Sequence, residues 1–159
     1  MDYWKDDMVV FLIGCSFSFE SHLMEAGVPV RNIEQKRNVS MYITTTPCSP
    51  VGLFDCPLVV SYRPVPSALV GTAVQVTQRY GAAHGPPVHI GDPHAIGIED
   101  INKPDFGDSV VASDGDIPVF WACGVTSTLA AISNPKAELV ITHAPGHMFI
   151  TDLKEFSEE

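Results

Sequence analysis

Residues 117–122 read Ile-Pro-Val-Phe-Trp-Ala, an apolar run with β-branched and aromatic residues that is typical of a buried strand. Small residues interrupt this run at 123–127 (Cys-Gly-Val-Thr-Ser), and we expect a helix from there to about Ile132. Asn134-Pro135 ends that helix, and a second strand is predicted at 138–141. Strand, helix and strand over such a length indicate a βαβ unit with parallel pairing. This segment therefore predicts an α/β fold class.

The residues upstream alternate between helical and extended patterns. Short helices are expected at 8–13 and 18–26, and a longer one from Ser67 to about Tyr80. Runs rich in β-branched residues at 28–33, 41–45 and 58–62 predict strands of an antiparallel or mixed sheet, with Arg63-Pro64 closing the last one. The chain thus combines a mixed sheet and helices (α+β elements) with the C-terminal βαβ segment.

Composition limits the function classes. The 159 residues suffice for one domain or two small lobes, and 9 Lys and Arg against 19 Asp and Glu give a net charge of -10. Without a basic run, nucleic acid and anionic membranes are disfavoured as partners. The four cysteines form neither a CxxC pair nor a disulfide framework, and the acidic N-terminus is not a signal peptide. We therefore expect a soluble, intracellular protein.

Two histidines, His143 and His147, lie four residues apart with Pro145-Gly146 between them. Proline and glycine forbid a continuous helix, so both imidazoles are expected on a sharp loop at the end of the predicted strand. There they would lie beside the turn at Cys123, since ligands of parallel sheets collect at carboxyl strand ends. Imidazole titrates near neutral pH, so the pair suits acid–base catalysis or metal binding, and a turn in which the rings cap backbone groups is the structural alternative.

Other residues suit binding of a carboxylate. Gly14-Cys15-Ser16 precedes a predicted helix and would present backbone N–H groups to an anion, or would be a simple helix corner. Arg63, between a strand end and a helix start, suits gripping a carboxylate, with a surface ion pair as the alternative. His84, His89 and His94 match no recognised ligand set, so we predict no metal site.

Six blocks of the chain resemble the signatures of one family, the D-glutamate cyclase-like hydro-lyases. The blocks are residues 11–20 (FLIGCSFSFE), 38–42 (NVSMY), 59–64 (VVSYRP), 84–93 (HGPPVHIGDP), 119–126 (VFWACGVT) and 142–148 (THAPGHM). They occur in the family's order and cover nearly the whole chain up to Leu153. Ser40 and Asp55-Cys56 depart from the family's usual residues, and both positions lie in predicted loops. The chain is expected to lack the family's N-terminal region.

The resemblance implies a two-lobed fold with a layered α/β domain. In this division, residues 1–27 are a helical segment of the α/β lobe, 28–116 a smaller α+β lobe, 117–153 the βαβ segment that completes the α/β lobe, and 154–159 an acidic tail. It also implies a lyase that eliminates water, with conversion of D-glutamate to 5-oxo-D-proline as the expected reaction. The compartment would be the mitochondrial matrix in a eukaryote and the cytoplasm in a bacterium.

Cyclisation needs a base for the ammonium, an oxyanion site and an acid for the departing oxygen. The expected catalytic residues are His143, His147 and, as a covalent nucleophile, Cys123. The expected substrate-binding residues are Cys15, Ser16, Glu20, Arg63, Gly124 and Thr126, with Glu20 also suited to relaying protons. We expect a small-molecule carboxylate as substrate, no cofactor and no metal, and homo-oligomerisation stays open. The alternative is a truncated, non-catalytic module that binds a metabolite or associates with itself.

Overall fold

Four strands form one antiparallel sheet in the computed structural model, which describes residues 3–152. They are β1 (Ser40–Pro47), β2 (Pro57–Pro66), β3 (His89–Ile90) and β4 (Asp116–Ala122). Their order in the sheet is β1-β2-β4-β3, so β2 and β4 are central and lie side by side. The strands predicted around 41–45, 58–62 and 117–122 are confirmed, and so is the antiparallel alternative for the sheet.

The strand β2 continues past Tyr62, where the sequence predicted its end. Pro64 faces Pro118 across the β2–β4 pair, and Cys123 donates its N–H to the Val59 carbonyl at 2.9 Å. Because hydrogen-bonded pairs alternate along an antiparallel ladder, the two prolines fall on a pair whose N–H groups point away from each other. The lack of N–H groups at Pro64 and Pro118 therefore removes no hydrogen bond between β2 and β4.

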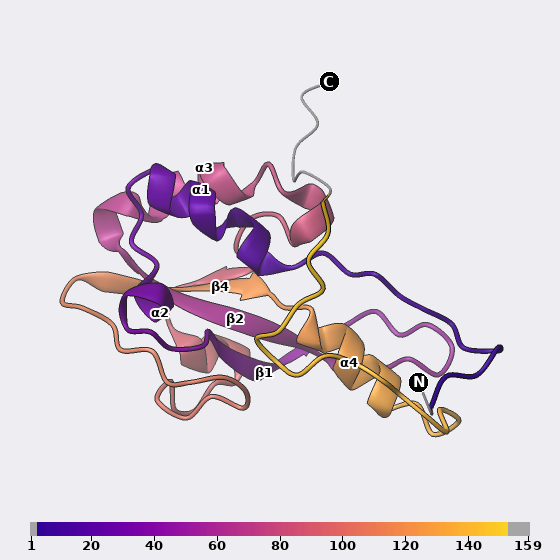
Figure 1. Cartoon of the computed structure of the whole chain (residues 1–159). Helices are drawn as coiled ribbons and strands as arrows, with labels where there is room; N and C mark the ends of the chain where they lie inside the picture. The colour runs from indigo at the N-terminus through magenta and orange to yellow at the C-terminus, as the bar shows by residue number, and fades with distance from the viewer. Residues whose placement is uncertain (1–2, 153–159) are drawn as a thin grey trace.

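Short helical segments precede, connect and follow the strands. They are η1 (Ser16–Phe19), α1 (Glu20–Glu25), α2 (Arg31–Glu34), η2 (Ser67–Leu69), α3 (Val70–Thr77), η3 (Gly81–Ala83), η4 (Pro93–Ile96) and α4 (Val125–Ile132). Figure 1 shows α1 and α3 side by side over the sheet. The helices predicted at 18–26, from Ser67 and up to Ile132 are confirmed in type. Residues 8–13 form no helix.

Alternation along β2 separates two cores. Successive side chains of a strand point to opposite faces. Val65 packs with Phe19 and Ala73 under α1 and α3, and Val59 packs with Val125 of α4. On the opposite face, a second core joins β2 to the loop layer; its buried members are Tyr42, Val60, Tyr62, Ile98, Val110 and Phe120. One face of the sheet is thus covered by helices and the other by loops.

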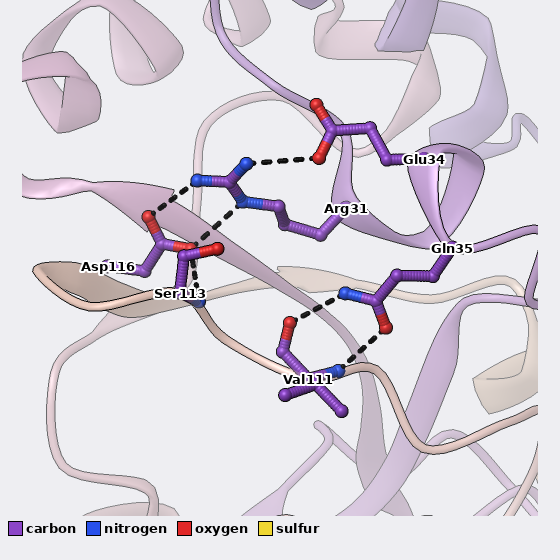
Figure 2. Close-up of polar contacts among 6 residues, drawn as sticks. All are labelled: Arg31, Glu34, Gln35, Val111, Ser113 and Asp116. Atoms are coloured by element: carbon purple, nitrogen blue, oxygen red, sulfur yellow. Dashed lines mark hydrogen bonds and ion pairs between the residues drawn. The ribbon is translucent and has the colours of Figure 1, made fainter.

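The segment predicted as a strand at 28–33 instead contains the single-turn helix α2, which is a correction. Arg31 donates from Nε and Nη2 to the two oxygens of Asp116, each at 3.0 Å, and from Nη1 to Glu34. Gln35 pairs with both backbone groups of Val111, at 2.7 and 3.0 Å (Figure 2). These long-range contacts tie the turn to the start of β4, and a local β pattern cannot contain that information.

The predicted βαβ unit is wrong. Residues 138–141 form no strand, and β4 is flanked by antiparallel partners, β2 and β3, on its two sides. The chain after α4 instead runs alongside that helix (Figure 1), where Thr142 lies 3.3 Å from Thr128 between hydroxyl oxygens. The physical reason is that no place beside β4 is left for a parallel strand. The fold class is therefore mixed α+β with an antiparallel sheet.

Within residues 3–152 no helix is long and apolar enough to cross a bilayer. The predicted acidic tail, 154–159, lies outside the described residues, and the division into two lobes stays a prediction.

Candidate functional site

The side chain of Arg63 lies on the helix-covered face of β2 and is only 1% exposed. Its Nε and Nη2 atoms both donate to Oε1 of Glu20, at 3.0 and 2.6 Å. Nη2 also reaches the Ser16 hydroxyl at 3.2 Å, and Nη1 the Ser61 hydroxyl at 3.0 Å. The guanidinium therefore joins η1, α1 and β2 at one buried point.

Two aromatic rings enclose this cation. The guanidinium carbon lies 5.2 Å from the centroid of the Phe19 ring and 5.6 Å from that of Trp121. Cation–π contacts of this kind strengthen when water is excluded. Trp121 is held in turn by its indole N–H, which donates to the Thr77 hydroxyl at 3.1 Å. The rings and hydrogen bonds together make a buried ion pair sustainable, because an unpaired charge there would be costly.

Three turns that are far apart in sequence converge next to this pair. A Cβ added at Gly14 would lie 2.3 Å from the carbonyl oxygen of Ala82, and one at Gly124 would lie 3.8 Å from the carbonyl oxygen of Gly14. The backbone at Gly14 therefore passes so close to η3 that only glycine fits there. This convergence brings the predicted residues Cys15, Ser16 and Gly124 into one region.

A cavity of about 340 Å³ opens beside these turns. Cavities of this size bind small molecules in other proteins. Its wall is mostly apolar and includes Cys48, Cys56, His84, Cys123, Gly124 and Thr126. Arg63 and Glu20 are not part of the wall, but the Arg63 charge acts on two wall residues, His84 and Cys123.

Burial keeps the thiols of this region protonated. It raises the pKa of Cys123 and that of Cys15, and the nearby Arg63 charge offsets this only in part. The thiolate is the nucleophilic form, so a raised pKa makes Cys123 a poor nucleophile at neutral pH. Its predicted role as a covalent nucleophile stays a prediction without support from this environment.

Thr126, predicted to bind substrate, lines this cavity and ties α4 to β2. Its hydroxyl accepts the N–H of Val59 at 3.0 Å and lies 3.2 Å from the Val59 carbonyl oxygen. This fixes the first turn of α4, with Cys123 and Gly124, against the end of β2. The Thr126 side chain therefore positions the cavity wall.

His143 and His147 do not reach this cavity. His143 lines a separate cavity of about 80 Å³ against α4, and its Nδ1 lies 3.0 Å from the Ala144 carbonyl oxygen. The Nδ1 atom of His147 lies 3.4 Å from the Pro145 carbonyl oxygen, and both rings are exposed. These contacts match the capping alternative, because each ring meets the backbone of its own loop. The expected placement of the pair beside the Cys123 turn depended on the βαβ unit, which the structure does not contain.

The imidazole of His84, which is not among the predicted site residues, lines the larger cavity. Its Nε2 atom is buried without a hydrogen-bond partner, and burial, with the Arg63 charge, lowers its pKa. The signal in the sequence was the block His-Gly-Pro-Pro at 84–87, which forbids a helix and indicates a turn. The sequence also places His84 at the start of the family-like block 84–93.

No group of three His, Cys, Asp or Glu side chains in the described part of the chain is arranged to hold a metal ion. The cavity wall instead offers thiols, one imidazole and backbone groups.

Comparison with known proteins gives one family. Its model, described as D-glutamate cyclase, matches residues 9–152. A Bacillus licheniformis protein, provisionally named a hydro-lyase, is 60% identical over 152 residues, covering 96% of this chain and 58% of the relative. YcsI of Bacillus subtilis, with the same provisional name, is 59% identical over 155 residues, 98% of this chain and 60% of the relative.

A Syntrophobacter fumaroxidans protein of the same provisional name is 61% identical over 146 residues, 92% of this chain and 56% of the relative. The chain thus spans less than two thirds of the length of these relatives. The family match and these identities, over nearly all of the described residues, show that the chain belongs to the D-glutamate cyclase family.

Proposed function

We propose that this chain carries the substrate cavity of a water-eliminating lyase, and that the reaction is the conversion of D-glutamate to 5-oxo-D-proline. The observation that supports it most is the cavity of about 340 Å³ between three convergent turns, with the buried Arg63 cation near it. The family description and the hydro-lyase names of the relatives point to the same reaction.

Cyclisation joins the α-nitrogen of glutamate to its γ-carboxyl carbon and breaks one carbon–oxygen bond there. The nitrogen loses two protons, and both leave with the departing oxygen as water. Catalysis therefore requires a group that holds protons between nitrogen and oxygen, together with donors for the negative oxygen of the intermediate.

The wall beside α4 suits the negative groups of such a substrate. Gly124 and Val125 begin this eight-residue helix, and the positive end of a helix dipole favours anions. The charge of Arg63 is close enough to shift the pKa of Cys15, Cys123 and His84. Because its donors already bind Glu20, Ser16 and Ser61, we assign Arg63 to positioning rather than to direct contact with a carboxylate. Glu20, as its partner, then has the same role.

The predicted acid–base role of His143 and His147 requires their loop to move to the cavity. Gly146 packs so closely on Asn38 that a Cβ there would lie 2.0 Å from Asn38 Nδ2. Asn38 Nδ2 also donates to the Pro145 carbonyl at 3.3 Å. The loop is therefore held against the end of β1, away from the cavity.

The test is turnover by the purified chain with D- and L-glutamate, measured as 5-oxoproline formed. Ala130 lines the cavity and its neighbour Ala131 does not, which gives a matched pair of variants. Ala130→Leu should fill part of the cavity and raise KM by at least about tenfold, while Ala131→Leu should stay within about twofold. Absence of turnover with every small amino acid tried, or equal effects of the two variants, would contradict the proposal.

The alternative, a module that associates with another chain, is favoured by one observation. The apolar residues 9–13 (Val-Val-Phe-Leu-Ile) are between 53% and 81% exposed. Contiguous apolar surface often marks an interaction site. Sedimentation of the chain, compared with a Phe11→Ser, Leu12→Ser variant, tests this. A monomer in both cases, together with turnover, would leave the lyase as the function.

A further inference from the structure

We propose that His84 is the residue that moves protons in this cavity, from the ammonium group of the substrate to the departing oxygen. This inference rests on the proposed function and names the group that the reaction needs.

The first observation is an unsatisfied nitrogen. The Nε2 atom of His84 is buried without a partner. Leaving a buried polar atom without a hydrogen bond destabilises the fold. Three other histidine rings meet backbone carbonyls: His89 Nε2 that of Asp92 at 2.8 Å, His143 Nδ1 that of Ala144 and His147 Nδ1 that of Pro145. A ring of the cavity wall that lacks such a partner is suited to receive one from a bound molecule.

The second observation is the backbone. His84 has a φ of +81°, in the left-handed region that few residues other than glycine adopt. Such a conformation is energetically unfavourable and persists where surrounding contacts impose it. Here Ala83 and Gly85 both donate their N–H groups to the Tyr80 carbonyl at 2.8 Å, and Gly14 packs on Ala82. The turn thus holds the imidazole at the cavity against a local conformational preference.

The third observation is the charge around the ring. Burial lowers the pKa of His84 from its ordinary value near 6.5, and the Arg63 cation lowers it further. The other titratable groups of the cavity wall are the thiols Cys48, Cys56 and Cys123, and burial raises the pKa of the last two. Outside the wall, Glu20 is paired with Arg63, and Cys15 has a raised pKa. His84 is therefore neutral at neutral pH, the form that can accept a proton.

One imidazole is enough to carry out the proton transfers of the reaction. Neutral His84 takes a proton from the substrate ammonium, and the freed amine attacks the γ-carboxyl carbon to form the carbon–nitrogen bond. The proton then returns from the imidazolium to the departing oxygen, and the second nitrogen proton goes to the same oxygen. Water leaves as the carbon–oxygen bond breaks, and the imidazole is neutral again, so no other reactant is consumed.

The experiment compares His84→Asn with His94→Gln in the full chain. Asparagine tolerates the left-handed region, so the turn should form without the imidazole. His94 is exposed and lies outside the cavity wall, so it is the control. His84→Asn should lower kcat by roughly 10²-fold or more, and His94→Gln should leave it within about twofold. The wild type should also lose kcat/KM below a pKa under 6.5, and His84→Asn should lose this limb.

A second variant separates chemistry from folding. His84→Gly keeps a residue that favours positive φ and leaves space for added imidazole. Imidazole in solution should restore at least about tenfold of the lost rate to His84→Gly and none to His94→Gln. Normal turnover in His84→Asn, or no rescue of His84→Gly, would overturn the role of His84 while leaving the lyase intact. A wild type without turnover would overturn the proposed function. NMR titration of the His84 ring with 5-oxo-D-proline would then test whether the ring contacts a bound molecule. Ring signals that do not shift would overturn the role of His84 as well.

Discussion

Two arginine–carboxylate pairs join segments that are distant in the sequence, and their geometries differ. Arg31 meets Asp116 with two nitrogens on two oxygens, each at 3.0 Å, at a site where the arginine side chain is 18% exposed (Figure 2). Arg63 meets Glu20 with two nitrogens on a single oxygen and is 1% exposed. The first pair closes a turn onto the start of β4. The second lies between aromatic rings near a cavity.

The difference shows that burial and neighbouring groups change what an arginine–carboxylate pair contributes to the protein. Arg31 and Asp116 satisfy each other almost symmetrically, and their bond raises the pKa of the Arg31 guanidinium. Arg63 divides its donors among Glu20, Ser16 and Ser61, and its charge still affects Cys15, Cys123 and His84. A charge in a buried region acts over longer distances, because little water screens it. We therefore assign the Arg31 pair to stability alone and the Arg63 pair to both stability and the site.

The largest expected effect comes from removing Arg63. Arg63→Met should lower the free energy of unfolding by about 3–5 kcal/mol, because it leaves Glu20 buried without its cation. Urea denaturation followed by circular dichroism measures this. Replacing both partners, as Arg63→Met with Glu20→Met, should recover part of the loss. A single variant that costs under about 1 kcal/mol would place the pair among weak surface pairs.

Removing Arg31 should have a smaller effect on stability and none on chemistry. Arg31→Gln should cost about 1–3 kcal/mol, since Asp116 loses two charge-assisted bonds but keeps the N–H of Ser113 at 2.9 Å. Turnover measured well below the melting temperature should be unchanged. A change in kcat equal to that of an Arg63 variant would remove the contrast between the two pairs.

The effects of the Arg31 and Arg63 charges on the pKa of His84 can be compared. Because its folded pKa is lowered, the unfolded chain takes up a proton first as the pH falls below 6.5. Stability should therefore decrease with falling pH from 6.5 down to the folded pKa, and His84→Asn should flatten that decrease. NMR titration should show the pKa of His84 rising in the Arg63→Gln, Glu20→Gln variant and unchanged in Arg31→Gln. If the pKa of His84 is unchanged in both variants, burial alone lowers it.

The smallest effect is expected at Glu34, the exposed partner of Arg31. Glu34→Gln removes a pair three residues apart on a helix turn and should cost only about 0.2–0.5 kcal/mol. Denaturation at low and high salt measures it, and the difference should disappear at high salt. A loss as large as that of Arg31→Gln would show that Glu34, rather than Asp116, is the main partner.

Patterns within single segments predicted most of the fold. The central strands, α1, α3 and α4 follow from alternating or helical runs bounded by Gly, Pro and Ser. The errors lie where distant residues decide: α2 is held by Asp116 and Val111, and the apolar run at 138–141 finds no place beside β4.

Seven of the nine predicted site residues come together in or near the cavity region: Cys15, Ser16, Glu20, Arg63, Cys123, Gly124 and Thr126. Thr126 lines the cavity, but its hydroxyl binds β2. The two loop histidines lie apart from it, and His84, which was not among the predicted site residues, takes a place in the wall. Residue type and local turn signals located the polar groups, but which imidazole meets the cavity depends on packing between distant turns.

The sequence by itself determined the family, the residue types of the site and most of the elements, because these depend on local pattern and on motif order. Only the tertiary structure decided that the sheet is antiparallel, that Arg63 is committed to Glu20, and that the orphaned imidazole is that of His84. Each of these depends on which distant segments meet and on how much water they exclude. Burial and strand pairing are properties of the whole fold, and no single stretch of residues determines them.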